Sequence, residues 1–373
     1  MEKKTLYLPH ELIVEILLRL PVKSLICFKC VCKSWYSLIS NPNFSNSHFQ
    51  LTAATHTRRI MSISVSPPKI CSIDFETSFT YDHASFNVNF WLPQSNFPVE
   101  IKGSCRGFIF LYCRPYIYLW NPSSGFKKQI HVSPFDTKLA PELSNDSDHI
   151  YGFGYDQSRD DYVVVVLSHE PTEENPFSSH LEFFSNRDNK WKEIEGTHFP
   201  YFSPQTEGGL FFNGAIHWLA FRPDIKIDVI VTFDLSDRKL FEMPLPEYFH
   251  QEVPFAQGLW VFGEFFSLYA QDFNNRTIEI WVMKEYKLNS SWTKTLVFDA
   301  DNYFLNFHFT PICSTNNGDI IGTIPGSRLV KYNDKGQLLE FRTFRNGPSE
   351  IVLYTETLLS LPGNNEQDYK LVE

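Results

Sequence analysis

The sequence predicts two unlike parts, a small α-helical segment at residues 1–50 and an all-β propeller of about six blades at residues 51–373. Leucines and isoleucines recur at helical spacing near the amino end, between two Leu-Pro pairs. Beyond residue 60, β-rich runs joined by tight turns recur about every 50 residues. Aromatic residues make up 16% of the chain, beside 23 Pro and 17 Gly, which favours β-structure with many turns.

The first helix is predicted to begin at Pro9, because proline fits the first helical turn, where its missing N–H costs nothing. Leu12, Ile16 and Leu20 then recur every four residues and would form one stripe of that helix. Pro21 ends the first helix and can begin the next. Two more short helices, ending before Asn41-Pro42, are predicted from Leu25, Phe28, Val31, Trp35, Leu38 and Ile39.

Three short helices in about 40 residues rarely build a stable core by themselves. Their apolar surface therefore packs either on the β-rich body or on a second protein. Burial of each Leu or Ile is worth ~1.5–3 kcal/mol, so four or five such residues could anchor a tight interface.

The segment LPHELIVEILLRLPVKSLICFKCVCKSWYSLI (residues 8–39) resembles an F-box, the module that docks onto a Skp-type adaptor and, through it, a cullin ubiquitin ligase. The resemblance implies ten residues that divide between the internal core and the adaptor contact, without assigning each one. These residues are Leu8, Pro9, Leu12, Ile16, Leu17, Leu20, Pro21, Leu25, Val31 and Trp35.

The seven cysteines are scattered and odd in number, which suits reduced thiols in the cytosol or nucleus. Cys27, Cys30 and Cys32 suggest a zinc site, but no second ligand pair lies at finger spacing. We therefore predict buried or half-buried thiols and no metal or cofactor. Charged residues interrupt the leucine-rich run, which argues against a secretion signal, and no run reaches the ~18 apolar residues of a membrane span. A cytoplasmic protein is expected, with the nucleus left open.

Charge divides unevenly along the chain. Residues 1–60 carry eight Lys and Arg against three acidic residues, a charge of +5, while the whole chain carries -10 and the rest therefore -15. An acidic body argues against nucleic acid as a partner. It favours a basic partner for the body and an acidic partner for the helical segment.

Five hairpin-like pieces recur through the body, each with an aromatic residue in its first run. These aromatics are Trp120, Phe184, Phe233, Trp281 and Tyr332. A second hairpin is predicted before each piece, and among the turns of these hairpins Asn213-Gly214 is the strongest tight-turn signal. Four strands per ~50 residues point to a β-propeller of kelch-like repeat length. Residues 71–76 would be a sixth, degenerate copy, and residues 354–361 the strand that closes the ring; five or seven blades, or an open sandwich of stacked sheets, remain alternatives.

The pieces CRGFIFL, YLWNPSSGFKKQI, YGFGYDQSRDDYVVV and FFNGAIHWLA resemble the plant F-box-associated domain, a group that includes S-locus F-box-like proteins. The resemblance implies a non-catalytic substrate-recognition subunit of an SCF-type (Skp adaptor–cullin–F-box) ubiquitin ligase. Pollen recognition of a basic stylar ribonuclease fits the acidic body. Defence and stress signalling, which other members of the group serve, stay open.

Two long connections, residues 131–150 and 168–180, are predicted on one face of the propeller. Long loops on a rigid scaffold often carry recognition, so we expect this face to bind a target protein with a basic patch. The alternative is that the loops are merely solvated. The acidic residues expected to contact the target are Asp136, Asp146, Asp148, Glu170, Glu173 and Glu174.

An enzyme is the least supported alternative. The sequence holds no HExxH, G-x-S-x-G or P-loop pattern, and His217 lies in an apolar strand, which predicts a structural histidine. The tryptophans lie in strand contexts, which favours blade core over a carbohydrate platform. A glycan- or ligand-binding propeller with the helices as a structural cap is therefore the second interpretation, and a hydrolase using the central channel the third.

Overall fold

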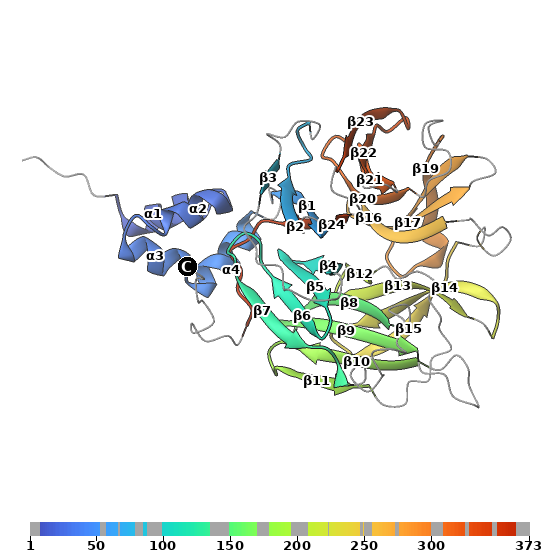
Figure 1. Cartoon of the computed structure of the whole chain (residues 1–373), viewed down its shortest axis with the longest axis horizontal. Helices are drawn as coiled ribbons and strands as arrows, with labels where there is room; N and C mark the ends of the chain where they lie inside the picture. Colours follow the sequence, from blue (N-terminus) through green and yellow to red (C-terminus); the bar gives the residue numbers. More distant parts are fainter. Residues whose placement is uncertain are drawn as a thin grey trace, which may run out of the picture.

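The computed structural model places four helices beside a six-bladed β-propeller (Figure 1). It describes residues 8–52, 57–65, 68–78, 85–87, 99–134, 149–169, 179–194, 208–222, 224–246, 249, 256–272, 276–299, 309–324, 328–344 and 349–362. The predicted combination of a helical segment and an all-β propeller is confirmed.

The helices are α1 (His10–Leu17), α2 (Val22–Phe28), α3 (Lys33–Ile39) and α4 (Pro42–Leu51). Pro9 and Pro21 cap α1 and α2, as the Leu-Pro pairs predict. The third helix ends before Asn41-Pro42, as predicted, since α3 ends at Ile39, but these two residues then begin a fourth helix that was not expected. Asn41 accepts a hydrogen bond from the backbone N–H of Asn43 and Pro42 takes the first helical position, the usual chemistry of a helix start.

The described strands form six four-stranded antiparallel sheets, and each is one blade. Blade 1 consists of β24 (Ser349–Thr355), β1 (Arg58–Val65), β2 (Pro68–Ile73) and β3 (Ser85–Asn87). Blade 2 consists of β4 (Glu100–Cys105), β5 (Phe108–Cys113), β6 (Tyr116–Trp120) and β7 (Lys127–His131), and blade 3 of β8 (His149–Asp156), β9 (Asp161–His169), β10 (Ser179–Ser185) and β11 (Lys190–Glu193).

Blade 4 consists of β12 (Leu210–Phe212), β13 (Ala215–Arg222), β14 (Ile227–Asp234) and β15 (Lys239–Met243). Blade 5 consists of β16 (Ala256–Phe262), β17 (Phe265–Asp272), β18 (Thr277–Met283) and β19 (Trp292–Asp299), with the short helix η5 (Asn289–Ser291) before its last strand. Blade 6 consists of β20 (Thr310–Ser314), β21 (Ile320–Ile324), β22 (Arg328–Tyr332) and β23 (Leu338–Thr343).

The carboxyl-terminal strand closes the ring, as predicted, but from different residues. β24 pairs with β1 from Ser349 to Thr355, so only the first two residues of the expected range 354–361 belong to the strand. The residues that follow leave the sheet and run toward the helices. The degenerate copy expected at residues 71–76 is confirmed as part of blade 1, where β2 ends at Ile73.

The repeated aromatic residues all lie on the third strand of a blade, where the repeat predicts them. Trp120, Phe184, Phe233 and Tyr332 are buried, and Trp281 is half-buried. Neighbouring blades interlock through such rings: Phe108 of blade 2 meets Tyr162 of blade 3 edge-on, with ring centres 5.0 Å apart. The propeller core therefore consists of apolar layers between successive sheets.

The two faces of the propeller differ in what they carry. Turns between the first and second and between the third and fourth strands of each blade lie on one face, which we call the turn face. The other connections lie on the opposite loop face. β24 ends and β1 begins on the turn face, where the N–H of Glu356 donates to the carbonyl of Thr57 over 3.0 Å. The helices before β1 therefore join the turn face.

Candidate functional site

The four helices share a small apolar core. Leu17, Leu25 and Ile39 are at most 1% exposed, and Phe44 of α4 packs with them. Leu358, from the far end of the chain, completes this cluster. The core is thus formed by residues that the sequence places on all four helices and by one leucine from the segment after β24.

A stripe of apolar side chains faces away from this core. Leu8, Leu12 and Ile16 are 50%, 49% and 52% exposed; Leu12 and Ile16 lie on one side of α1, and Leu8 lies just before its first turn. We call these three residues the apolar stripe. Val31, in the turn between α2 and α3, and Tyr36, within α3, are 60% and 58% exposed. Large apolar side chains exposed at this level, gathered in one small module, indicate a surface for another protein.

The ten residues implied by the F-box resemblance separate into two groups. Leu17 and Leu25 lie inside the helical core, and Leu20 and Trp35 pack partly against it, with Trp35 5.4 Å from the Phe28 ring. The exposed members are Leu8, Pro9, Leu12, Ile16, Pro21 and Val31. Periodicity alone does not reveal this division, because α4 and Leu358 decide which side of each helix is covered.

The three cysteines of the helical segment are exposed, so the expectation of buried or half-buried thiols was wrong. Cys27, Cys30 and Cys32 lie where α2 ends and α3 begins, on the side away from the helical core. None of the seven cysteines, which all lie among the described residues, forms a disulfide. Among the described residues, no group of His, Cys, Asp or Glu side chains is arranged to hold a metal ion.

Residues 356–362, which we call the clasp, run between the helices and the propeller. Leu358 enters the helical core, while Leu359 and Leu361 enter the apolar layer between blades 2 and 3. Phe49 of α4 packs on the same layer. The clasp therefore joins two hydrophobic cores with successive side chains.

Side-chain amides hold the clasp in place. Asn121, fully buried after β6, donates through Nδ2 to the carbonyls of Thr357 (3.3 Å) and Leu359 (3.1 Å). Asn186 Nδ2 donates to the carbonyl of Pro362 over 2.9 Å. These bonds satisfy backbone groups in a segment that has no sheet partner, which explains the buried asparagines at these turns.

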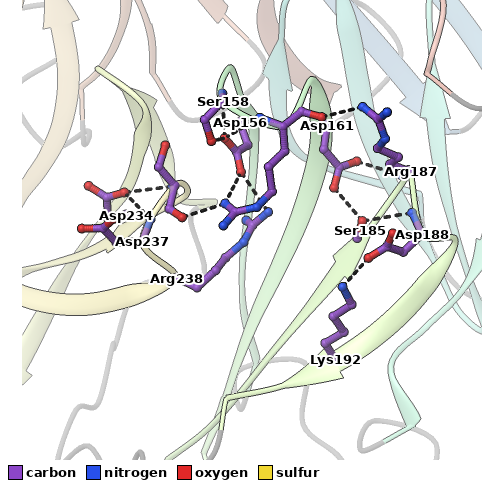
Figure 2. A network of polar contacts seen from close by, with 12 residues as sticks. Asp156, Ser158, Asp161, Ser185, Arg187, Asp188, Lys192, Asp234, Asp237 and Arg238 are labelled. Carbon is purple, nitrogen blue, oxygen red and sulfur yellow. Dashed lines mark hydrogen bonds and ion pairs between the residues drawn. The ribbon is translucent and has the colours of Figure 1, made fainter.

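The turn face of blades 3 and 4 carries a network of charged groups (Figure 2). The buried carboxylate of Asp156 binds Arg159 at 2.9 Å and Arg238 at 3.1 Å. Burial raises its pKa, but hydrogen bonds from Ser158 and Arg159 and the charge of Arg238 outweigh burial, so the pKa lies below its ordinary value. The network thereby ties the turns of two blades together.

The same network continues along blade 3. Asp161 accepts hydrogen bonds from the Ser185 hydroxyl (2.6 Å) and the Arg187 backbone N–H (2.8 Å), and Lys192 pairs with Asp188 (Figure 2). Sequence reasoning missed these residues. The only signal in the sequence was that Asp, Ser and Arg recur at the tight turns. These residues are common in ordinary turns, so their recurrence does not distinguish a charged network from turn formation.

The predicted target-contacting acidic residues all lie outside the described residues. This holds for Asp136, Asp146, Asp148, Glu170, Glu173 and Glu174. The strands on either side of these two segments do meet the loop face: β7 and β9 end there, and β8 and β10 begin there.

His217 is a buried structural residue, as predicted. Its Nδ1–H donates to the carbonyl of Leu210 over 3.1 Å, and its Nε2 accepts from the Tyr286 hydroxyl over 2.8 Å. Burial lowers the pKa of this imidazole to about 4. Trp120, Trp218 and Trp260 are also buried, so they are blade core and not an exposed platform for sugars.

Comparison with known protein families identifies both parts of the chain. The family described as F-box associated beta propeller domain matches residues 59–320, and the F-box domain matches residues 6–47. This chain belongs to the F-box proteins with an F-box-associated β-propeller. No described helix of this F-box protein is both long enough and apolar enough to span a membrane.

Its relatives match over most of their length. F-box/kelch-repeat protein At3g23880 of Arabidopsis thaliana is 30% identical over 304 residues, which cover 78% of this chain and 79% of that protein. F-box protein CPR1 of the same plant is 25% identical over 363 residues, covering 92% of this chain and 86% of that protein. The F-box match ends inside α4, and Phe49, just beyond the match, packs on the propeller.

Proposed function

We propose that this F-box protein is a non-catalytic substrate receptor of an SCF-type ubiquitin ligase. The observation that carries the proposal is the apolar stripe: Leu12 and Ile16 are exposed on α1, whose opposite side is buried, and Leu8 is exposed just before it. The F-box match supports the same role, because an F-box binds a Skp-type adaptor.

The adaptor contact is assigned to the exposed side of the helices. The apolar stripe and Val31 form its apolar surface, flanked by Pro9 and Pro21. Leu17 and Leu25 act indirectly, by holding the helices in register from inside. Burial of each exposed Leu or Ile contributes ~1.5–3 kcal/mol before the entropy cost of association is subtracted.

The receptor performs no bond chemistry itself. The helices tether the adaptor and its cullin, and the propeller holds a target, which raises the target's effective concentration near the ubiquitin-charged enzyme. The clasp supports this division, since it fixes the helices to the turn face and leaves the loop face for the target.

Adaptor binding tests the proposal. Leu12→Asp combined with Ile16→Asp should abolish pull-down of a Skp-type adaptor, because both side chains are exposed and a charge there blocks burial without opening the core. Phe341→Asp is the matched control: it is 54% exposed on β23 of the propeller and should leave the pull-down intact. Undiminished capture by the α1 variant would refute the proposal.

Target capture tests the role of the loop face. We infer that a target with a basic patch binds there, since the chain outside its first 60 residues carries a charge of -15. Replacing Glu170, Glu173 and Glu174 by Lys should reduce target capture while adaptor pull-down stays intact. Unchanged target capture would count against a basic target. Defence, stress signalling and pollen recognition of a basic ribonuclease all fit this charge.

A further inference from the structure

A cavity of about 350 Å³ lies on the turn face where α4, the turns of blades 2 and 3 and the clasp meet. We propose that it binds a small anion carrying a phosphate or carboxylate group. Two arginines, Arg106 and Arg187, lie in its wall, and the carboxylate of Asp160 is its one acidic group among the described residues. The wall thus carries a net positive charge on a propeller that is acidic overall.

Arg106 is held in the cavity wall without an ionic partner. Its guanidinium lies between two aromatic rings, 3.9 Å from the centre of Tyr155 and 4.7 Å from the centre of Phe49. It forms no ion pair with a carboxylate of the described residues, and its Nε is buried there without a hydrogen-bond acceptor. Aromatic faces attract a cation but do not accept its hydrogen bonds as an oxyanion does.

Arg187 shares this property, whereas its neighbours do not. Its Nη1 donates to the backbone carbonyl of Arg159 over 2.8 Å, and no carboxylate of the described residues pairs with its guanidinium. In the adjoining network, Arg159 and Arg238 pair with Asp156 (Figure 2). Of these four arginines, the two that line the cavity have no carboxylate partner among the described residues.

An anion would complete this arrangement. Arg106 is half-buried and its Nε is fully buried without an acceptor, which is costly unless the guanidinium is paired. Both arginines can bind phosphate or carboxylate through two parallel N–H donors. The first turn of α4, with Pro42 and Ser45, also lines the cavity and adds the positive end of a ten-residue helix. The Tyr155 hydroxyl in the same wall donates to Asp160 over 2.7 Å, so it engages that carboxylate and not the anion.

The remaining wall indicates the kind of anion. Leu359, Leu361 and Pro362 of the clasp supply an apolar side, and 350 Å³ lies at the lower end of the range for small-molecule pockets. An anionic head with a compact apolar body, such as a phenyl ring, matches both sides. Because α4, the clasp and two blades contact the cavity, its ligand would touch the helices and the propeller together.

Titration calorimetry of the full-length chain with phenyl phosphate, at constant ionic strength, tests the proposal. We expect saturable binding with a dissociation constant below about 1 mM, and no binding of neutral benzyl alcohol. Arg106→Gln and Arg187→Gln should each weaken binding at least about tenfold. Arg187 is exposed, so its variant should fold even if loss of the Arg106 ring contacts disturbs α4.

Arg276→Gln is the matched control, an exposed arginine outside the cavity that should leave phenyl phosphate binding unchanged. If inorganic phosphate binds as tightly as phenyl phosphate, the anion site is supported, but the apolar wall contributes nothing to the affinity. Absence of saturable binding of both probes up to about 10 mM would overturn the proposal. Equal affinity of the wild type and the Arg187→Gln variant would overturn it as well.

Discussion

Gly107 shows how one backbone position connects the propeller to the clasp. It lies at φ +86°, where L side chains are rare, and a Cβ there would overlap the Thr357 side chain and lie 2.7 Å from the carbonyl oxygen of Thr355. Gly214 has a similar φ of +76° but has no atom within 4 Å of the same position. Substitution at Gly107 would therefore meet both an unfavourable φ and a close contact, whereas substitution at Gly214 would meet the unfavourable φ alone.

We predict that Gly107→Ala lowers the free energy of unfolding more than Gly214→Ala. Each variant forces alanine into the left-handed region, at about 1–2 kcal/mol. Only the first also pushes on the clasp, which adds about 1–3 kcal/mol of overpacking. Chemical denaturation of both variants measures the difference. Equal losses would show that the clasp moves aside without cost.

His217 predicts a pH dependence of stability. Its pKa is about 4 in the folded chain and 6.5 in the unfolded chain, because burial disfavours the imidazolium. Below pH 6.5 the unfolded chain therefore binds a proton that the folded chain refuses, and stability falls as the pH drops toward 4. The contribution amounts to about 3 kcal/mol across that window.

His217→Gln should remove this term. The destabilisation caused by the variant, measured by denaturation, is expected to be largest near pH 7 and to shrink as the pH approaches 4. A destabilisation that stays constant over this range would show that the imidazole titrates alike in both states.

The division of the apolar helical residues could be predicted only in part. Sequence spacing placed Leu12 and Ile16 on one stripe, and both are exposed there. Spacing also placed Leu20 on that stripe, but α1 ends at Leu17 and Leu20 turns partly into the core. The end of α1 and the residues that cover the helices, including Leu358, depend on tertiary packing, which the spacing of apolar residues does not predict.

At the scale of elements, the clasp offers a matched pair of leucines. Leu358 is 7% exposed and packs with the helices, while Leu361 is 2% exposed and packs with blades 2 and 3. We predict that Leu358→Ala loosens the helices and weakens adaptor binding, although it lies more than 300 residues from them in sequence. Leu361→Ala should instead loosen the propeller side.

Each substitution should cost about 2–5 kcal/mol locally, as buried Leu→Ala changes do. Limited proteolysis read out by peptide mapping distinguishes the two, with faster cleavage within residues 8–52 expected only for Leu358→Ala. The same cleavage pattern in both variants would mean that Leu358 and Leu361 do not stabilise the helical core and the propeller independently.

The elements missed from the sequence have identifiable causes. Asn41-Pro42 correctly marked the end of the third helix, but the same pair is also a cap followed by a first-turn proline, and the start of α4 there was not expected. The closing strand was expected too late because the apolar residues 358–361 resemble strand core. They are buried by the clasp contacts instead.

At the scale of the whole molecule, repetition made the propeller predictable. Each blade has to bury two faces against its neighbours, so aromatic third strands recur with the period of the fold. The cavity with Arg106 and Arg187 was not predictable in this way. It depends on α4, two blades and the clasp meeting at one place, which are segments from both ends of the chain and from its middle.

The helices join the turn face, so the proposed adaptor contact and the proposed target contact would lie on opposite sides of the propeller, and this arrangement is the central prediction. Hydrogen exchange of the full-length chain, with and without a Skp-type adaptor, tests it most directly. Added protection is predicted in residues 8–17 and 31–36, with none in the strand ends of the loop face. Protection at the loop face, or none in α1, would contradict the account.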